Sequence, residues 1–416
     1  MVVENSQKSN EEDLSQAINE MRAVTHKFAE DIIRPAAMKL DTMSPEDVIA
    51  KESPLFDVFR AWYGSKNHAG FADVDVNDGG KISNAVLFEL GWGSSDLAVS
   101  LGVASMPFQM VDMMTRMTGD TALKGEIVDP FLEDTEGKII GCWAITEPMH
   151  GSDMLAVGTQ EYANPNTAGG CRASKDGDDW ILNGQKSAWV SNGTIASHAL
   201  LFCGIDSSKG AAGGGVAVVP LDLPGVHKGP PLDKMGQRAL NQGEIFFDDV
   251  RIPARYMLVD PSLYTFALEM VLGTANTGMG TIFAGVARAC YDEAMNYAKE
   301  RSQGGRPIAQ HQLVQGLLFK MFMRAEGARA LSEYTIDVHA GLGIPSLPHA
   351  IASKVTSTAA AYEVASDAVQ VHGGIGLAKG VLIEKLFRDA RASLIEDGVN
   401  ELLMLVGAGH LLTANN

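Results

Sequence analysis

The sequence contains few cysteines and no long apolar run. Its four cysteines, Cys142, Cys171, Cys203 and Cys290, stand far apart, so none forms the closely spaced pair that is typical of a metal or redox site. Scattered cysteines in a long chain predict free, buried thiols in a reducing compartment. No uninterrupted apolar segment approaches the roughly 18 residues that a membrane-spanning helix needs. We therefore expect no membrane insertion.

Positive charge is also scarce. Lys and Arg number 33 against 51 Asp and Glu, which gives a formal net charge of -18. Nucleic-acid binding depends on clustered Lys and Arg that neutralise phosphates, so this balance excludes a nucleic acid as a general partner. A small anionic ligand remains compatible with it, because a few local cations or a helix N-terminus can hold a phosphate.

The two ends of the sequence carry no recognisable targeting signal. The opening segment MVVENSQKSNEEDLSQ lacks the apolar core of a secretory signal and the Arg residues of a transit peptide. The closing segment LLTANN is not a peroxisomal signal. We therefore expect an intracellular protein, in a bacterial cytoplasm rather than in a mitochondrial matrix.

Three stretches of different character follow one another along the chain. Residues 11–37 and 83–125 carry apolar side chains at spacings of three and four, which predicts helices. Ser44 before Pro45 predicts a helix cap with Pro at the first helical position. From Ile139 onward short β-type runs alternate with turn pairs, which predicts a small β-domain. The expected strands are Ile139–Ile145, Trp180–Leu182, Ala199–Cys203, Gly215–Pro220 and Glu244–Phe247.

The last third returns to helical spacing and predicts a four-helix bundle. The expected helices are 263–301, 309–341, 347–372 and 381–412. Together these patterns predict an α+β chain of three domains. We place them at residues 1–138 (helical), 139–260 (β-barrel-like) and 261–416 (helical bundle).

Two polar motifs follow predicted strands in the β-domain. The first, Thr146-Glu-Pro-Met-His-Gly-Ser-Asp153, ends a strand that contains Trp143. The second runs from Trp180-Ile-Leu-Asn-Gly-Gln-Lys186 into Trp189-Val-Ser-Asn-Gly193. In this order they resemble the acyl-CoA dehydrogenase family, whose pattern is TEPxxGSD followed by WxLNGxKxWITNG.

The resemblance continues in order along almost the whole chain. Its further segments are Lys234-Met-Gly-Gln-Arg238, Phe246-Phe-Asp-Asp-Val-Arg-Ile-Pro253, Arg301 with His311-Gln312, Gln370-Val-His-Gly-Gly-Ile-Gly376 and Arg388-Asp-Ala. No single segment is decisive, but the ordered set is strong. It implies an N-terminal helical domain, a central β-domain and a C-terminal four-helix bundle, with FAD as cofactor.

The resemblance also implies which residues hold FAD. Trp189 would stack on the flat flavin ring, and the Thr146 and Ser191 hydroxyls would bond its polar edge and stabilise the reduced form. Arg301 would bind the pyrophosphate. The full cofactor set is Trp143, Ile145, Thr146, Ser152, Trp189, Val190, Ser191, Arg301, Gln312, Gln370, Val371, His372, Gly373, Gly374, Val399 and Glu401.

In the family, the segments matching Gln312 and Gln370–Gly374 bind the adenine half of FAD from a neighbouring subunit. The resemblance therefore implies a homo-oligomer, which we expect to be a tetramer. The substrate would be an acyl-CoA thioester, with Ser152, Asn276, Glu396 and Gly398 in contact with it. An electron-transfer flavoprotein is the expected electron acceptor.

A carboxylate must remove the α-proton of the thioester. The family supplies it as Glu in an I-Y-E-G-T-S stretch, and this sequence reads Ile395-Glu-Asp-Gly-Val-Asn400. Alignment on the glycine assigns the base to Asp397. Glu396 remains an alternative base, and a structural role for both as cap or surface charges is a third interpretation.

Several departures from the family surround the expected flavin and acyl sites. Ala275 stands where some relatives carry the base, Asn276 stands for a usual Arg, and Gly304 stands for a Phe. The spacing from Lys186 to Trp189 is one residue longer than usual. Because Asp is one methylene shorter than Glu, we expect a branched or cyclic acyl group that brings its α-carbon closer.

Two other functions remain open at this point. Asp397-Gly398-Val-Asn400 also matches a nitroalkane-oxidase-like flavoenzyme, which would consume dioxygen without a flavoprotein partner. A scaffold that binds a ligand without turnover is the other alternative, and it would purify colourless.

Overall fold

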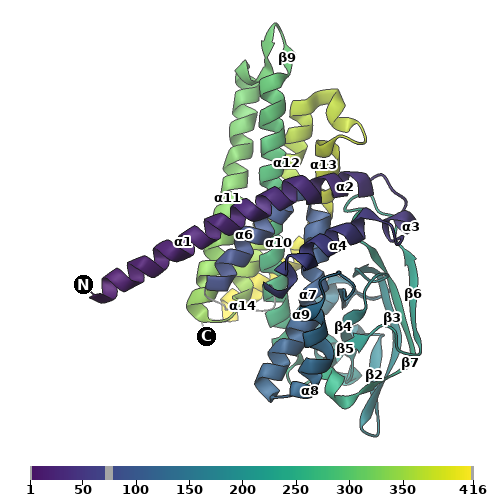
Figure 1. The fold of residues 1–416 in the computed structure, drawn as a ribbon. Coiled ribbons are helices and arrows are strands. Elements are labelled where there is room, and N and C mark those ends of the chain that lie inside the picture. The colour runs from purple at the N-terminus through teal and green to yellow at the C-terminus, as the bar shows by residue number, and fades with distance from the viewer. Residues whose placement is uncertain (1, 71–77, 414–416) are drawn as a thin grey trace. The chain divides into compact units, whose positions relative to one another are not determined.

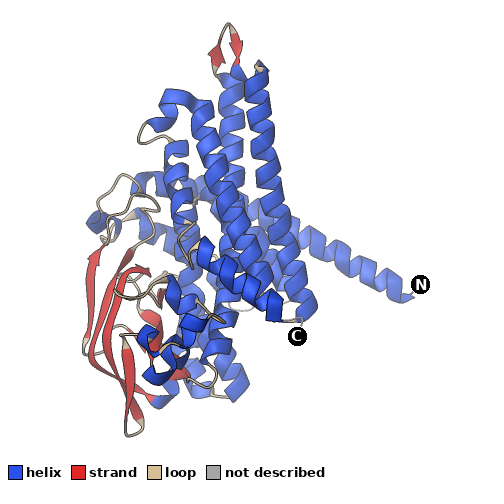
Figure 2. Cartoon of the chain, turned by 180° about the vertical axis from the view of Figure 1, so that it is seen from behind, coloured by secondary structure: helices blue, strands red, loops and turns tan. Residues whose placement is uncertain are grey.

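The computed structural model describes residues 2–70 and 78–413. Helices occupy most of the chain, with a single large sheet near its middle (Figures 1 and 2). The helices are α1 (Val2–Phe28), α2 (Arg34–Leu40), α3 (Pro45–Val48), α4 (Pro54–Gly64), α5 (Asn67–Gly70), α6 (Asp78–Gly93), α7 (Ser95–Thr118), α8 (Thr121–Leu123), α9 (Asp129–Glu133), α10 (Tyr264–Glu300), α11 (Gln312–Leu342), α12 (Leu347–His372), α13 (Leu382–Ala392) and α14 (Asn400–Thr413).

The strands follow in the middle of the chain, with one small hairpin later. They are β1 (Gly141–Ala144), β2 (Arg172–Asp176), β3 (Asp179–Ser191), β4 (His198–Gly204), β5 (Gly214–Pro220), β6 (Val226–Pro231), β7 (Gln242–Pro253), β8 (Met257–Val259), β9 (Ser302–Gln303) and β10 (Arg306–Pro307). The helix, sheet, helix order therefore confirms the predicted fold class. The three domain boundaries stay a prediction, because contacts divide the chain differently.

Two compact units emerge from those contacts. The helical unit comprises Met1–Met38, Val74–Ala98 and Gly273–Glu396, and the sheet unit comprises Lys39–Asp73, Val99–Leu272 and Asp397–Asn416. Each unit therefore collects segments that are far apart in the sequence.

Small residues let the helices of the helical unit approach closely. A Cβ added at Gly91 of α6 would lie 2.1 Å from the Ile282 carbonyl oxygen of α10, so only glycine fits there. Phe88, Ala284, Ala328 and Ala360 form the buried centre where α6, α10, α11 and α12 meet. Burial of these apolar faces, rather than helix propensity, stabilises the bundle.

The sheet unit is built on one sheet of eight strands. Its order is β6-β7-β3-β1-β4-β5-β8, with β2 pairing both β3 and β4. Strand β1 runs parallel to β4 and antiparallel to β3. Gly141 lets α7 pack on β1, because an added Cβ there would lie 2.5 Å from Pro107.

Asn192 joins three parts of the sheet unit. It is fully buried, with its backbone in the left-handed region at φ 62°. Its Nδ2 donates to the carbonyl oxygens of Ser100 on α7 and Gly141 on β1, and its Oδ1 accepts from the Ser100 hydroxyl. The turn that follows β3 is thereby fixed against both α7 and β1.

Most predicted elements match those of the structure. Ser44 caps α3 by accepting from Asp47 N, as the sequence indicated. Three of the four late helices agree, but the predicted helix 381–412 is wrong, because it divides into α13 and α14. The break contains Asp397 and Gly398 at φ 51° and φ 96°, which an α-helix does not accommodate.

Helix α7 has the length and the mean hydropathy, 1.3, of a membrane span. However, 72% of that stretch is buried inside the fold. It therefore packs as a core helix.

Candidate active site

The ends of β1 and β3 present one group of the predicted cofactor residues. Trp143 pairs with Ser191 across the two strands. Ile145 and Val190 are buried, whereas Thr146 and Ser191 are half-buried. Trp189 is 57% exposed, which is unusual for so large an aromatic side chain in a sheet. We call Thr146, Trp189 and Ser191 the strand-end group.

A bulge in β3 places Trp189 outward. Lys186 pairs with Ile245 and Val190 pairs with Gly243, so four steps along β3 face two along β7. The residue that lengthens the Lys186-to-Trp189 spacing lies in this bulge. Bulges redirect side chains at functional edges of sheets, which explains how the strand-end group reaches the surface.

Gln242 supports the strand-end group, and the sequence analysis did not identify it. Its Nε2 donates to the Trp189 carbonyl oxygen and to Ser191 Oγ, both at 3.2 Å. Trp143 Nε1, nearby on β1, is buried and has no hydrogen-bond partner among the described residues. A stacking ring, two hydroxyls and an orphaned donor suit a flat ligand with a polar edge.

The loop after Thr146 is held by its own side chains. His150 Nδ1 lies 2.7 Å from Asp153 Oδ2, and Asp153 also accepts from Gly151 N. Glu147 N donates to the His150 carbonyl oxygen at 2.8 Å. These contacts fix the turn that carries Ser152.

Ser152 connects this loop to the predicted base. Its Oγ accepts from Val399 N at 3.0 Å. Gly398 packs against Leu403 and Leu155, where an added Cβ would lie 2.8 Å and 3.3 Å from their side chains. The half-buried Asp397 is therefore held in a turn directly beside the Ser152 loop.

The other residues predicted around the base lie in different surroundings. Val399 is half-buried, and Glu401 is exposed in the first turn of α14. Glu396 is half-buried and lies in a turn that follows α13. Glu396 and the fully buried Asn276 of α10 belong to the helical unit.

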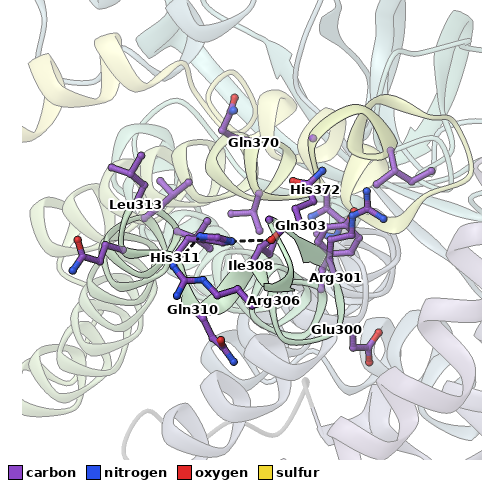
Figure 3. A pocket seen from close by; sticks show the side chains of 18 of the residues that line it. Glu300, Arg301, Gln303, Arg306, Ile308, Gln310, His311, Leu313, Gln370 and His372 are labelled. Carbon is purple, nitrogen blue, oxygen red and sulfur yellow. Dashed lines mark hydrogen bonds between the residues drawn. The ribbon is translucent and has the colours of Figure 1, made fainter.

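A second group of predicted residues lines a cavity in the helical unit (Figure 3). The cavity measures about 1500 Å³ and lies between the β9–β10 hairpin, the start of α11 and the end of α12. All seven cofactor residues predicted in this unit line it: Arg301, Gln312, Gln370, Val371, His372, Gly373 and Gly374. We call it the hairpin cavity.

Polar and apolar side chains both face the hairpin cavity. Figure 3 shows the His311 ring directed toward Gln303, whose carbonyl oxygen lies 3.0 Å from His311 Nε2. Tyr297 stacks on His372 at 4.2 Å. Leu313 is 91% exposed.

Arg301 contributes an exposed positive charge to this cavity, and no ion pair of its side chain is found among the described residues. An unpaired guanidinium beside exposed apolar side chains suits the phosphates and the base of a nucleotide.

The four cysteines are all free and buried in the described structure. Burial raises the pKa of the Cys171 thiol to about 11 and that of Cys142 to about 12. Thiols of such high pKa are poor nucleophiles, which fits a structural role.

Family models match two long segments of the chain. The "Acyl-CoA dehydrogenase, middle domain" matches residues 142–250, and the "Acyl-CoA dehydrogenase, C-terminal domain" matches residues 267–412. The first segment contains the strand-end group and the second contains the hairpin cavity and Asp397.

Curated relatives and solved structures agree with these models. The chain is 30% identical over 400 residues to the mitochondrial short-chain specific acyl-CoA dehydrogenase of Rattus norvegicus, covering 94% of this chain and 89% of the relative. It is 34% identical over 294 residues to the Bos taurus protein of the same name, covering 71% and 67%.

Butyryl-CoA dehydrogenase from Megasphaera elsdenii has the same fold, with a TM-score of 0.79 and 25% identity over 95% of this chain and 98% of that one. A glutaryl-coenzyme A dehydrogenase in complex with glutaryl-CoA superposes with a TM-score of 0.80 at 24% identity, covering 95% of each chain. The chain therefore belongs to the acyl-CoA dehydrogenase family of oxidoreductases.

Proposed function

We propose that this protein is an FAD-dependent acyl-CoA dehydrogenase that desaturates an acyl thioester between its α- and β-carbons, with Asp397 as the base. One observation carries the proposal. The Asp397–Gly398 turn is bonded through Val399 N to Ser152, in the loop that leaves the strand-end group. A carboxylate is thereby fixed next to the segment that would hold the flavin.

The residues of the strand-end group fit a flavin. Trp189 would contact a face of its ring, and the Thr146 and Ser191 hydroxyls would bond its polar edge. When bound, the flavin supplies the acceptor for the hydride that leaves the β-carbon. The Asp397 carboxylate takes the α-proton, and the electrons of the broken α-C–H bond form the new double bond. Glu401, Val399 and Gly398 would border the same region.

The hairpin cavity would hold the pyrophosphate and adenine part of an FAD molecule. Arg301 would pair with the pyrophosphate, and Gln312 and the Gln370–Gly374 segment would surround the adenine. In our proposal this cavity serves the FAD of a neighbouring copy in a homo-oligomer, a tetramer. Exposed apolar side chains on α11 support burial against another chain, since Leu313, Phe319 and Met323 are 91%, 63% and 60% exposed.

We propose an acyl-CoA as substrate, with Ser152, Asn276 and Glu396 as further contacts. Named relatives act on butyryl- and glutaryl-CoA thioesters, so a short chain is a reasonable first choice. The short Asp397 side chain supports a branched or cyclic acyl group. An electron-transfer flavoprotein is the proposed acceptor, and the free buried thiols support a cytoplasmic location.

The oxidase alternative is not favoured. The relatives named above are dehydrogenases, and a 3-(aryl)acrylate reductase of Clostridium sporogenes is 27% identical over 394 residues. Both names describe chemistry at a carbon–carbon bond rather than consumption of dioxygen.

An anaerobic titration of the yellow protein with a panel of acyl-CoA thioesters tests the proposed function. Straight, branched and cyclic short acyl groups would be compared by bleaching of the flavin absorbance. We expect bleaching with at least one thioester and strongest with a branched or cyclic one. A protein that takes up no FAD, or whose flavin no thioester bleaches, would refute the proposal.

A further inference from the structure

A buried ion pair lies directly behind the strand-end group. Lys186 of β3 is fully buried and Glu147 is 5% exposed. Lys186 Nζ lies 2.7 Å from Glu147 Oε1. The two residues are 39 positions apart in the chain, so the fold itself brings them together.

Both partners also make hydrogen bonds to the backbone. Lys186 Nζ also donates to the Ile145 carbonyl oxygen at 3.0 Å. Glu147 Oε1 accepts from Cys171 N at 3.1 Å, and Oε2 accepts from Gly170 N at 2.5 Å. The pair is therefore held by the backbone just after β1 and just before β2.

Thr146 stands between the two anchored positions. Its neighbour Ile145 is held by Lys186 through the carbonyl, and its neighbour Glu147 is held by Lys186 through the side chain. The Thr146 carbonyl oxygen itself accepts from Ser187 N at 2.9 Å. From Gly141 to Glu147 only Thr146 is not buried. The Lys186 ammonium group thus holds the Ile145 carbonyl oxygen and the Glu147 side chain, on the two sides of Thr146.

Stability alone does not explain this arrangement. Removing two charges from water is costly, and well-packed apolar residues of similar volume often stabilise a core equally well. A fully satisfied polar network instead fixes one geometry. Hydrogen bonds to a cofactor depend on such fixed geometry, and supporting residues behind the contacting ones commonly provide it.

We infer that Lys186 and Glu147 are positioning residues, which hold the Thr146 hydroxyl in the orientation that bonds the flavin edge. The inference rests on the proposed function. It predicts that loss of the pair weakens the hydrogen bond to the reduced cofactor more than to the oxidised one. The midpoint potential of the bound flavin should therefore fall.

The chain offers a matched control for the ion pair. Lys385 of α13 is 1% exposed and lies 2.9 Å from Asp96 Oδ2 and 2.5 Å from Asp389 Oδ2. It is as buried as Lys186 and pairs with two carboxylates instead of one, but it belongs to the helical unit and lines no part of the hairpin cavity. Lys385→Met should lower stability without changing the flavin.

The test compares Lys186→Met, the double variant Lys186→Met/Glu147→Gln and Lys385→Met in the holoenzyme. The double variant leaves no unpaired buried charge, so it should recover stability relative to Lys186→Met. We expect about tenfold weaker FAD binding in both Lys186 variants, with a displaced flavin absorbance band and a lower midpoint potential. Lys385→Met should keep the wild-type band and potential.

An equal band and potential in wild type and the double variant would overturn the inference, and so would the same displacement in Lys385→Met. A wild-type protein that binds no FAD would instead refute the proposed function, which keeps the two failures distinct.

A second experiment does not depend on the folding of any variant. It measures amide hydrogen exchange of the full-length wild type without FAD. The amides of Gly170 and Cys171, which bond to Glu147, and of Ser187, which bonds to Thr146, should exchange as slowly as the other amides of β3. Exchange at the rate of exposed turns would overturn the inference, because the Thr146 segment would then not be fixed in advance.

Discussion

The strand-end group and the hairpin cavity differ in how their side chains are held before any ligand arrives. Beside Thr146 and Ser191, hydrogen bonds from Lys186 and Gln242 already hold the Ile145 carbonyl oxygen, the Glu147 carboxylate and the Ser191 hydroxyl. In the hairpin cavity, by contrast, the Arg301 side chain is exposed and Leu313 stands in solvent. Buried hydrogen bonds hold the strand-end group in place. The side chains of the hairpin cavity are exposed instead, so they are available to bind a ligand.

Because of this difference, we expect substitutions in the two regions to change different free energies. A change in the sheet interior should cost folding free energy, because buried partners lose their hydrogen bonds. A change at an exposed cavity wall should cost ligand affinity and leave folding almost untouched. Three variants test that division.

The largest expected effect is on the sheet side. Asn192→Ala removes the amide that joins Ser100, Gly141 and the turn after β3, and leaves their groups unsatisfied. We expect a loss of about 3 kcal/mol in the free energy of unfolding, measured by urea denaturation. Asn166→Ala, at an exposed position of the short 3-10 helix Pro165–Thr167, is the control. Equal stabilities of the two variants would contradict the assignment of stability to this interior.

Arg301→Met should show the opposite pattern. Loss of a charge-assisted contact to the pyrophosphate should weaken FAD binding by about tenfold to a hundredfold, or about 1.4–2.8 kcal/mol, while the unfolding midpoint of the apoprotein stays within error. Lys379→Met removes one exposed positive charge that lines no part of the cavity and should leave affinity unchanged. Fluorescence titration of the apoprotein with FAD measures the affinity of both variants. Equal losses of affinity in the two would contradict the role of Arg301 in FAD binding.

The smallest effect concerns pH. Burial lowers the pKa of His198 on β4 from 6.5 to about 4. The unfolded chain binds the proton more readily than the folded chain, so protonation of His198 favours unfolding. Above pH 6.5 His198 is neutral in both states, and the folded state has its full stability. Part of that stability is lost as the pH falls from 6.5 toward 4. At pH 5.5 the loss should be about 1 kcal/mol, and His198→Gln should flatten this part of the stability profile. A variant with the wild-type slope would contradict the assignment.

The sequence predicted both regions but not the contacts that distinguish them. The motifs around Thr146 and Trp189 end regular strands, so local pattern located them. The missed strands lack such a pattern. β6 is an edge strand that contains Pro230 and Pro231, which a central strand would exclude, and the short β2 is almost wholly polar and exposed.

Other features depended on distant parts of the chain. The Lys186–Glu147 pair joins residues 39 positions apart, and the two Gln242 contacts join residues 51 and 53 positions apart. No local spacing encodes such pairs. The break before α14 was missed because its residues continue the apolar pattern of a helix on both sides. Asp397-Gly398 carried the available signal, since a glycine after an acidic residue favours a left-handed turn.

The central claim is that Asp397, held beside the Ser152 loop, removes the α-proton. Rapid anaerobic mixing of the FAD-loaded enzyme with saturating acyl-CoA tests it most directly, by the rate of flavin bleaching in wild type, Asp397→Asn and Glu396→Gln. We predict that Asp397→Asn still binds the thioester but bleaches about a thousandfold more slowly, whereas Glu396→Gln loses at most about tenfold. Bleaching of Asp397→Asn at the wild-type rate, or a larger loss in Glu396→Gln, would contradict the account.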